Sequence, residues 1–193
     1  MYKRQGVYKN DNVANLQLVN CNGDTVSLHD TCGQSKAHWL LGTAGWCSAC
    51  SEMLAGLNQQ FGENGVLSRA SIAAAQPGLD LWVILGENQQ GGAPSQQFCK
   101  SYAQSNGLDP AMVLIDFVSP EVDIPLVDPP GYSVPVSGLG NTWQAVNPYL
   151  VADGQGVSLG YPWNATLRGT NMEYHWSDYM GGDLNQALGE LLQ

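Results

Sequence analysis

The stretch LLGTAGWCSAC, from Leu40 to Cys50, places two cysteines directly after a run of apolar and small residues. The residues before the pair, KAHWLLGTA, show no helical period and predict a buried central strand. The apolar residues between Met53 and Phe61 then recur on one face of a helix that begins at the pair. This order places Cys47 at the first turn of a helix, where unpaired backbone N–H groups and the helix dipole stabilise a thiolate.

The chain continues with an alternation of strands and helices. LDLWVILGE and AMVLIDF are short apolar runs that predict two more inner strands. Between them, Pro94 and Ser95 open a predicted helix that runs to Ser105. Strands that alternate with helices favour parallel pairing, and we expect helices on both faces of a central sheet. Further predicted elements are a hairpin in NLQLVNCNGDTVSL, a helix over residues 66–75, a hairpin in NPYLVADGQGVSLGY and a C-terminal helix in DLNQALGELLQ.

The length of 193 residues suits one domain with a full core, which we expect to span residues 1–193. The proline-rich stretch at residues 119–140 has no usable period, and too little chain follows it for a second domain. It therefore predicts a long irregular insertion. No apolar run reaches the ~18–20 residues that a membrane helix needs, so we expect no membrane-spanning segment.

Charge is sparse and acidic. The chain has 7 Lys and Arg against 17 Asp and Glu, a formal net charge of −10. A phosphate backbone would be repelled, and no basic stripe exists to hold it, so we expect no nucleic-acid partner. The first residues, MYKRQGVYKNDNVANLQ, lack the apolar core of a signal peptide, which predicts either a cytoplasmic protein or one whose export signal has been removed.

Cysteines at positions 21, 32, 47, 50 and 99 leave at least one thiol free or paired outside the chain. Two thiols at the spacing of Cys47 and Cys50 can form a redox couple, half of a metal site or a structural crosslink. A zinc site would need Cys21 and Cys32 as its second half. Structural zinc ligands usually come as two closely spaced pairs, and the wide spacing of these two cysteines disfavours zinc. We expect no metal ion.

At this point the residues resemble a known family. WLLGTAGWCSACSEM resembles the active site of the thioredoxin fold, and NGDTVSL resembles the opening of its redoxin subgroup. That subgroup contains the alkyl-hydroperoxide-reductase/thiol-specific-antioxidant proteins and the exported thioredoxin-like reductases. The resemblance runs from about Leu16 to Gly160. It implies an α/β, thioredoxin-like fold with a central mixed sheet flanked by helices, an N-terminal hairpin and an irregular insertion before the strand that begins with a cis-proline.

The resemblance also implies roles for individual residues. Cys47 would be the nucleophile and Cys50 the resolving cysteine of a WCxxC motif that needs no cofactor. NPYLVADGQGVSLG is similar to the family's cis-proline strand, so Pro148 would face the disulfide and Asn147 would offer its backbone to an extended substrate. Trp46 would shape the rim of the site.

The chain departs from the family at several positions. Leu41 occupies the place of thioredoxin's buried Asp, which implies that the usual proton acceptor is absent or supplied elsewhere. Ala44 stands where peroxiredoxins have Thr or Ser, which disfavours peroxidase activity. The dipeptide between the cysteines, Ser48-Ala49, indicates neither direction of electron flow.

The remaining cysteines predict the compartment. The turn NGD brings the chain back, so Cys21 and Cys32 are predicted to form a structural disulfide, with Cys99 as a free core thiol. Such a bond persists in oxidising compartments, and we therefore expect an extracytoplasmic protein, periplasmic or lipoprotein-anchored. The predicted function is thiol–disulfide exchange with protein thiols and disulfides by a monomer. The alternative is a non-catalytic redoxin-like module that binds a partner through residues 119–140 and buries Cys47 beneath them.

Overall fold

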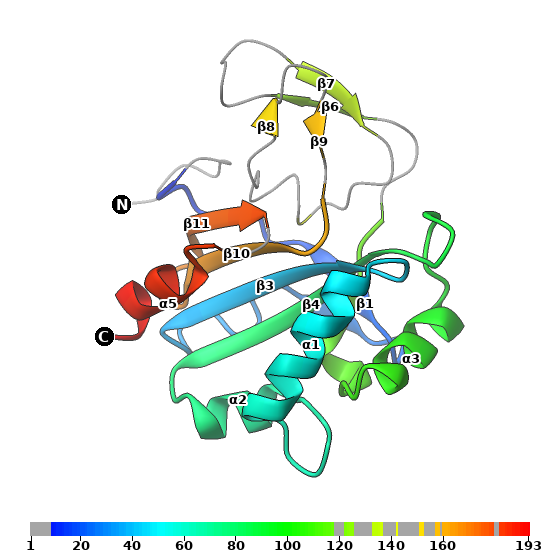
Figure 1. Cartoon of the computed structure of the whole chain (residues 1–193). Coiled ribbons are helices and arrows are strands. Elements are labelled where there is room, and N and C mark those ends of the chain that lie inside the picture. The colour runs from blue at the N-terminus through cyan, green and yellow to red at the C-terminus, as the bar shows by residue number, and fades with distance from the viewer. Residues whose placement is uncertain are drawn as a thin grey trace.

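The computed structural model describes residues 9–117, 122–125, 133–136, 142, 151–152, 157–158, 160–179 and 182–193. Its centre is a seven-stranded sheet in the order β11-β10-β3-β4-β5-β1-β2 (Figure 1). The strands are β1 (Gln17–Asn20), β2 (Thr25–Ser27), β3 (Ala37–Ala44), β4 (Leu79–Glu87), β5 (Val113–Ile115), β10 (Trp163–Arg168) and β11 (Glu173–Tyr179). The helices are α1 (Ser48–Phe61), α2 (Arg69–Ala75), α3 (Gln96–Ser105) and α5 (Leu184–Leu192), with a short 3-10 helix at Pro110–Met112.

The pairing of the strands gives a mixed sheet, as predicted. β3 runs parallel to β4, and β4 runs parallel to β5. β10 lies antiparallel on the other side of β3, and β11 follows it as an edge strand. Every residue of β3 is buried, which explains why its sequence shows no alternation of apolar and polar side chains.

The four described helices contribute their buried side chains to one core cluster. Leu54 of α1, Ile72 of α2, Tyr102 of α3 and Leu191 of α5 all belong to the cluster that contains Trp39 of β3. The crossovers from β3 to β4 and from β4 to β5 step across the sheet in the same direction, so right-handed connections place their helices on the same face. The expectation of helices on both faces is therefore not met by these helices.

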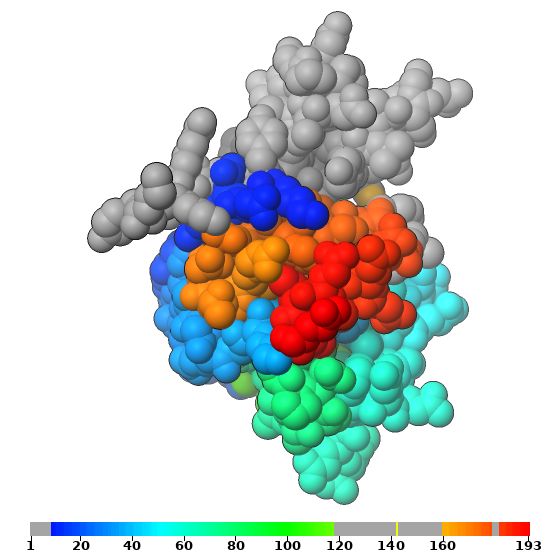
Figure 2. All heavy atoms as spheres, turned by 90° about the vertical axis from the view of Figure 1, so that its left-hand side faces the viewer, coloured from blue at the N-terminus to red at the C-terminus, as the bar shows by residue number. Residues whose placement is uncertain are grey.

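The other face of the sheet is covered in part by the N-terminal segment. Val13 and Leu28 pack there against Leu40 and Trp82 of the central strands. At one end of the sheet, α5 lies over β10 and β11 (Figure 2). None of the helices in the described ranges is long and apolar enough to cross a membrane.

The predicted insertion at residues 119–140 lies mostly outside the described residues. Within it, β6 (Val122–Pro125) pairs with β7 (Ser133–Val136) in antiparallel fashion. Further on, β8 (Val151–Ala152) pairs with β9 (Val157–Ser158), which confirms the predicted hairpin there. This hairpin is separate from the main sheet, however, and the strand beside β3 is β10. The placement of the family's later strand at NPYLVADGQGVSLG is therefore wrong.

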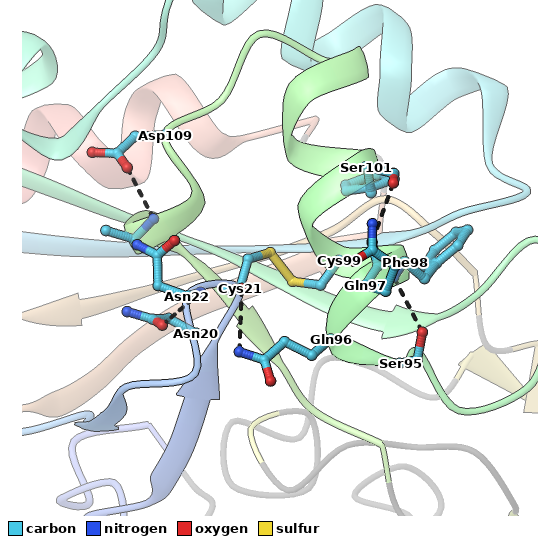
Figure 3. The surroundings of a disulfide bond; sticks show 12 residues. Asn20, Cys21, Asn22, Ser95, Gln96, Gln97, Phe98, Cys99, Ser101 and Asp109 are labelled. Atoms are coloured by element: carbon cyan, nitrogen blue, oxygen red, sulfur yellow. Dashed lines mark hydrogen bonds between the residues drawn. A yellow bond between two sulfur atoms is a disulfide. The ribbon is translucent and has the colours of Figure 1, made fainter.

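A second disulfide joins the end of β1 to α3 (Figure 3). It links Cys21 and Cys99, whose Cα atoms are 5.2 Å apart and which are separated by 78 residues in sequence. Both cysteines are fully buried. The Cys21 N–H donates to the carbonyl of Val113 at 3.0 Å, and Gln96 Nε2 donates to the Cys21 carbonyl at 3.4 Å.

The predicted disulfide between Cys21 and Cys32 is wrong, and so is the prediction that Cys99 is free. The hairpin is present, but β2 already ends at Ser27, and the turns that follow carry Cys32 away from Cys21. Cys32 is the free cysteine and is exposed, with its Sγ 3.7 Å from the carbonyl oxygen of Thr170. Cys21 instead points into the core beneath α3.

Candidate active site

The cysteine pair lies where β3 passes into α1. Cys47 is the N-cap residue of α1, and Cys50 lies in its first turn. The two form a disulfide with a Cα–Cα distance of 5.3 Å, and the Cys50 N–H donates to Cys47 Sγ at 3.1 Å. The first turn of the helix contains no acidic residue. Cys50 is fully buried and Cys47 is 5% exposed.

Carboxylates gather at the same edge of the sheet, because the carboxyl ends of the parallel strands β3, β4 and β5 meet there. Glu87 ends β4, and its Oε2 accepts a hydrogen bond from Trp46 Nε1 at 2.5 Å. Asp116 follows β5, is 2% exposed, and accepts the backbone N–H of Thr142 at 2.6 Å. Neither carboxylate was predicted from the sequence as a site residue, although each lies at the end of an apolar run that predicts a strand.

Tyr161 approaches the pair from the chain that leads into β10. It packs against the small cluster formed by Ala44, Cys47 and Cys50. Its ring meets that of Trp46 edge to face, with centroids 5.8 Å apart and an interplanar angle of 82°. Burial raises the pKa of the Tyr161 phenol, and the negative charges of Glu87 and Asp116 raise it further, so the phenol is neutral.

The Tyr161 hydroxyl lies directly against the backbone of β4. A Cβ added at Gly86 would come within 2.0 Å of the Tyr161 oxygen, so a side chain at this position would displace the phenol. The glycine is needed here for close approach. It follows that β4 and the segment before β10 are fitted together beside the disulfide.

Of the residues predicted to bind substrate, Trp46 lies at the site and is 46% exposed. Asn147 and Pro148 lie outside the described residues, so their roles stay a prediction. Among the described residues, the cis peptide bond is the one between Tyr161 and Pro162, at the start of β10. This position was not predicted, because β10 was not identified as a strand from the sequence.

The zinc alternative required Cys21 and Cys32 to complete a site with the active-site pair. The structure instead joins Cys21 to Cys99 and leaves Cys32 exposed elsewhere. Within the described ranges, no three His, Cys, Asp or Glu side chains come together as metal ligands.

No family model and no curated relative matches the sequence. Several solved structures do share its fold. A thiol:disulfide interchange protein of the thioredoxin family from Chlorobium tepidum is 15% identical, with a TM-score of 0.56 over 97% of this chain and 100% of that one. The exposed lipoprotein thioredoxin of Streptococcus pneumoniae is 18% identical, with a TM-score of 0.53 over 92% and 100%. A thiol:disulfide interchange protein from Bacteroides sp. is 11% identical, with a TM-score of 0.54 over 96% and 91%.

At such low identities the comparisons establish the fold. The chain has the thioredoxin fold that its sequence predicts, with a disulfide-bonded CxxC pair at the start of α1. The fold and the pair together define the class as a thioredoxin-fold protein with a CxxC site.

Proposed function

We propose that this protein is a thiol–disulfide oxidoreductase that exchanges electrons with protein substrates through Cys47 and Cys50. The observation that carries the proposal is the disulfide at the N-terminus of α1, where Cys47 Sγ accepts a backbone N–H. Backbone donors and the helix dipole at this position stabilise a sulfur anion, which is the attacking and leaving species in exchange.

The reaction needs only the two cysteines. In the reducing direction, the Cys47 thiolate attacks a substrate disulfide, a mixed disulfide forms and one substrate thiolate leaves. The Cys50 thiolate then attacks Cys47 Sγ, which re-forms the Cys47–Cys50 bond and releases the second substrate thiolate. Two electrons pass to the substrate, and the reverse sequence oxidises a substrate dithiol.

The surrounding charges favour the reducing direction. Glu87 and Asp116 raise the pKa of Tyr161, which packs on the pair, and the same negative charges oppose a thiolate at Cys47. An oxidising pair is one whose reduced, thiolate form is strongly stabilised. These carboxylates limit that stabilisation, so we infer a pair closer to thioredoxin than to a strong oxidant.

An apolar rim beside the disulfide suits a substrate backbone. Trp46 is half exposed, and Tyr161 and Pro162 lie at the amino end of β10. We propose that these three residues contact the substrate. The same role for Asn147 and Pro148, which lie outside the described residues, stays a prediction.

The low exposure of Cys47 favours a second candidate, a non-catalytic module that binds a partner. Cys47 is only 5% exposed, and Tyr161 packs against it. Exchange requires a substrate sulfur to reach Cys47 Sγ. A binding module would keep the disulfide closed to any protein disulfide, whereas an oxidoreductase opens it when substrate displaces the neighbouring side chains.

We place the protein outside the cytoplasm, as a monomer. A Cys21–Cys32 bond no longer supports this compartment, but the buried Cys21–Cys99 disulfide does, because such bonds are rare in reducing environments. One structure with the same fold is described as an exposed lipoprotein.

The test of the proposed function is capture of a substrate. Cys50→Ser leaves Cys47 able to form a mixed disulfide that cannot be resolved, so a model disulfide substrate such as insulin should become attached. In a Cys32→Ser background, which removes the exposed free thiol, Cys47→Ser should capture nothing, and Cys32→Ser alone should behave as the wild type with respect to exchange. Absence of a mixed disulfide in Cys50→Ser, in a folded protein, would favour the binding module.

A further inference from the structure

Ser35, His38 and Asp80 form a hydrogen-bonded chain at the edge of the sheet opposite to the cysteine pair. Ser35 Oγ lies 3.0 Å from His38 Nε2, and His38 Nδ1 lies 2.9 Å from Asp80 Oδ2. His38 and Asp80 are register partners on the parallel strands β3 and β4, so they point to the same face. Ser35 lies in the short segment between the preceding turn and β3. None of these residues has a part in the proposed disulfide exchange.

The positions of the protons in this hydrogen-bonded group follow from the ionisation of Asp80. Burial by itself raises the pKa of this carboxyl, but hydrogen bonds from His38 and Arg69 outweigh it and lower the pKa to about 2. An ionised carboxylate only accepts hydrogen bonds, so His38 Nδ1 carries the proton that faces Asp80. In the neutral imidazole, Nε2 is then the acceptor for the Ser35 hydroxyl. His38 is fully buried, so water does not compete for either nitrogen.

Arg69 binds both oxygens of the Asp80 carboxylate and leaves its Nη1 group over. Its Nε and Nη2 bind the two oxygens of Asp80 at 2.6 and 2.8 Å, and its guanidinium lies 3.8 Å from the centre of the Trp82 ring. Thr31 Oγ1 adds a further hydrogen bond to Asp80 at 3.1 Å. Nη1 of Arg69 has no hydrogen-bond partner among the residues that the structure describes.

A cavity of about 180 Å³ opens beside these hydrogen-bonded residues. Ser35, Asp80 and Arg69 are among the residues that line it, so the serine and the arginine border the same space. The volume accommodates a small acyl group. The walls contributed by Gly78, Leu79 and Ala73 are largely apolar.

We propose that Ser35 is a nucleophile for small acyl esters or thioesters, with His38 as its general base and Asp80 as the residue that orients His38. The arrangement of the three residues is that of the Ser-His-Asp triad, which is recognised by geometry and occurs on unrelated folds. The positive charge of Arg69 at the cavity wall suits the oxyanion of the tetrahedral intermediate.

The steps balance with water as the only co-reactant. Ser35 Oγ forms a bond to the acyl carbon while its proton passes to His38 Nε2, and that proton then leaves with the alcohol or thiol of the donor. Water attacks the acyl group in turn, gives a proton to His38, and restores the Ser35 hydroxyl as the carboxylic acid departs. Asp80 shares its two oxygens between His38 and Arg69, so we expect it to support His38 less in the second step and the acyl-serine to accumulate.

The experiment uses the oxidised full chain carrying Cys32→Ser, which removes the exposed free thiol, with p-nitrophenyl acetate. We expect a burst of nitrophenolate and one acetyl group, which peptide mapping locates on Ser35. Ser35→Ala should abolish the burst, and His38→Gln should slow it at least about 100-fold. Ser101→Ala is the matched control, because Ser101 is an exposed serine whose hydroxyl donates to the Gln97 carbonyl, and it should leave the burst unchanged.

A second variant tests the contact between residue 35 and His38 even if His38→Gln fails to fold. In a Cys32→Ser background, Ser35→Cys places a thiol against His38, and iodoacetamide should alkylate it about 10-fold faster than it alkylates Cys32 in the wild type. Three outcomes would each overturn the proposal. One is acetylation at other sites only, and another is equal acetylation of Ser35 in His38→Gln. The third is alkylation of the Ser35→Cys thiol no faster than that of Cys32. Disulfide exchange by Cys47 should be unchanged in Ser35→Ala, so failure here is separate from failure of the proposed function.

Discussion

Tyr161 stands edge-on to Trp46, with ring centroids 5.8 Å apart, and packs on the disulfide between Cys47 and Cys50. One ring comes from the loop before α1, and the other comes from a segment more than half the chain away that leads into β10. Together they border the disulfide at the N-terminus of α1. We therefore expect access to Cys47 to depend on Tyr161.

Removal of the Tyr161 ring should expose Cys47. In the reduced protein we expect Tyr161→Ala to raise the rate of Cys47 alkylation about 10-fold, because the side chain that covers the thiol is gone. Tyr161→Phe is the matched control: it keeps the ring, and its rate should stay close to that of the wild type. Stopped alkylation followed by mass spectrometry measures both rates. An unchanged rate in Tyr161→Ala would mean that other residues control access.

Loss of the Cys21–Cys99 disulfide should destabilise the fold. The bond closes a loop with a sequence separation of 78, for which a chain-entropy estimate is about 4.5 kcal/mol. We expect this loss of unfolding free energy in the double variant Cys21→Ala/Cys99→Ala, measured by guanidinium unfolding. Cys32→Ser removes a free thiol and should change stability little.

In the wild type, a non-reduced digest should yield a linked Cys21–Cys99 peptide and a free Cys32. A Cys21–Cys32 peptide would contradict the structure.

The ionisation of Asp80 should make the free energy of unfolding depend on pH in the acid range. Its pKa is lowered from 3.8 to about 2 in the folded state, so the unfolded chain binds the proton more readily. The stabilisation, about 2 kcal/mol, is present above pH 4 and is lost as the pH falls towards 2. Asp80→Asn should remove this part of the pH dependence and cost about 3 kcal/mol near neutral pH, because Arg69 and His38 lose their buried partner. Asp183→Asn, at an exposed N-cap without a side-chain bond, should do neither.

Glu87 should tune the cysteine pair. Glu87→Gln removes a negative charge beside the site while keeping an acceptor for Trp46 Nε1, so the Cys47 thiolate should be easier to form. A more stable reduced state raises the reduction potential, by about 20 mV for an effect near 1 kcal/mol. Equilibration with glutathione measures it. Glu63→Gln, exposed near the far end of α1, is the control, and an equal shift in both variants would exclude a local effect.

The sequence predicts the elements around the cysteine pair because their signals are local. β3 and β4 appear as apolar runs, and α1 appears as a helical period that begins at Cys47. β10 is not predicted by the search for apolar runs. Its buried face carries Asn164 and Thr166, with Asn164 accepting a hydrogen bond from Trp39, so its polar residues do not mark a solvent face.

The cysteine pairing and the second cluster depend on contacts between distant parts of the chain. Cys21 meets Cys99 only because β1 joins the sheet next to β5 and thereby comes under α3. The sequence shows a hairpin with Cys32 close by, and this pattern predicts a Cys21–Cys32 disulfide, which is the wrong pairing. His38 and Asp80 become neighbours through the register of β3 and β4, which hydrophobic periodicity does not specify.

The reduction potential of the Cys47–Cys50 disulfide tests the central claim most directly. Equilibration with a glutathione or dithiothreitol couple, followed by acid quenching and mass spectrometry, gives the fraction oxidised in the wild type and in Cys32→Ser. If the pair is a redox couple held by the N-terminus of α1 and restrained by nearby carboxylates, its potential should lie between about −200 and −270 mV. A potential below about −300 mV, typical of a structural disulfide, would contradict the account.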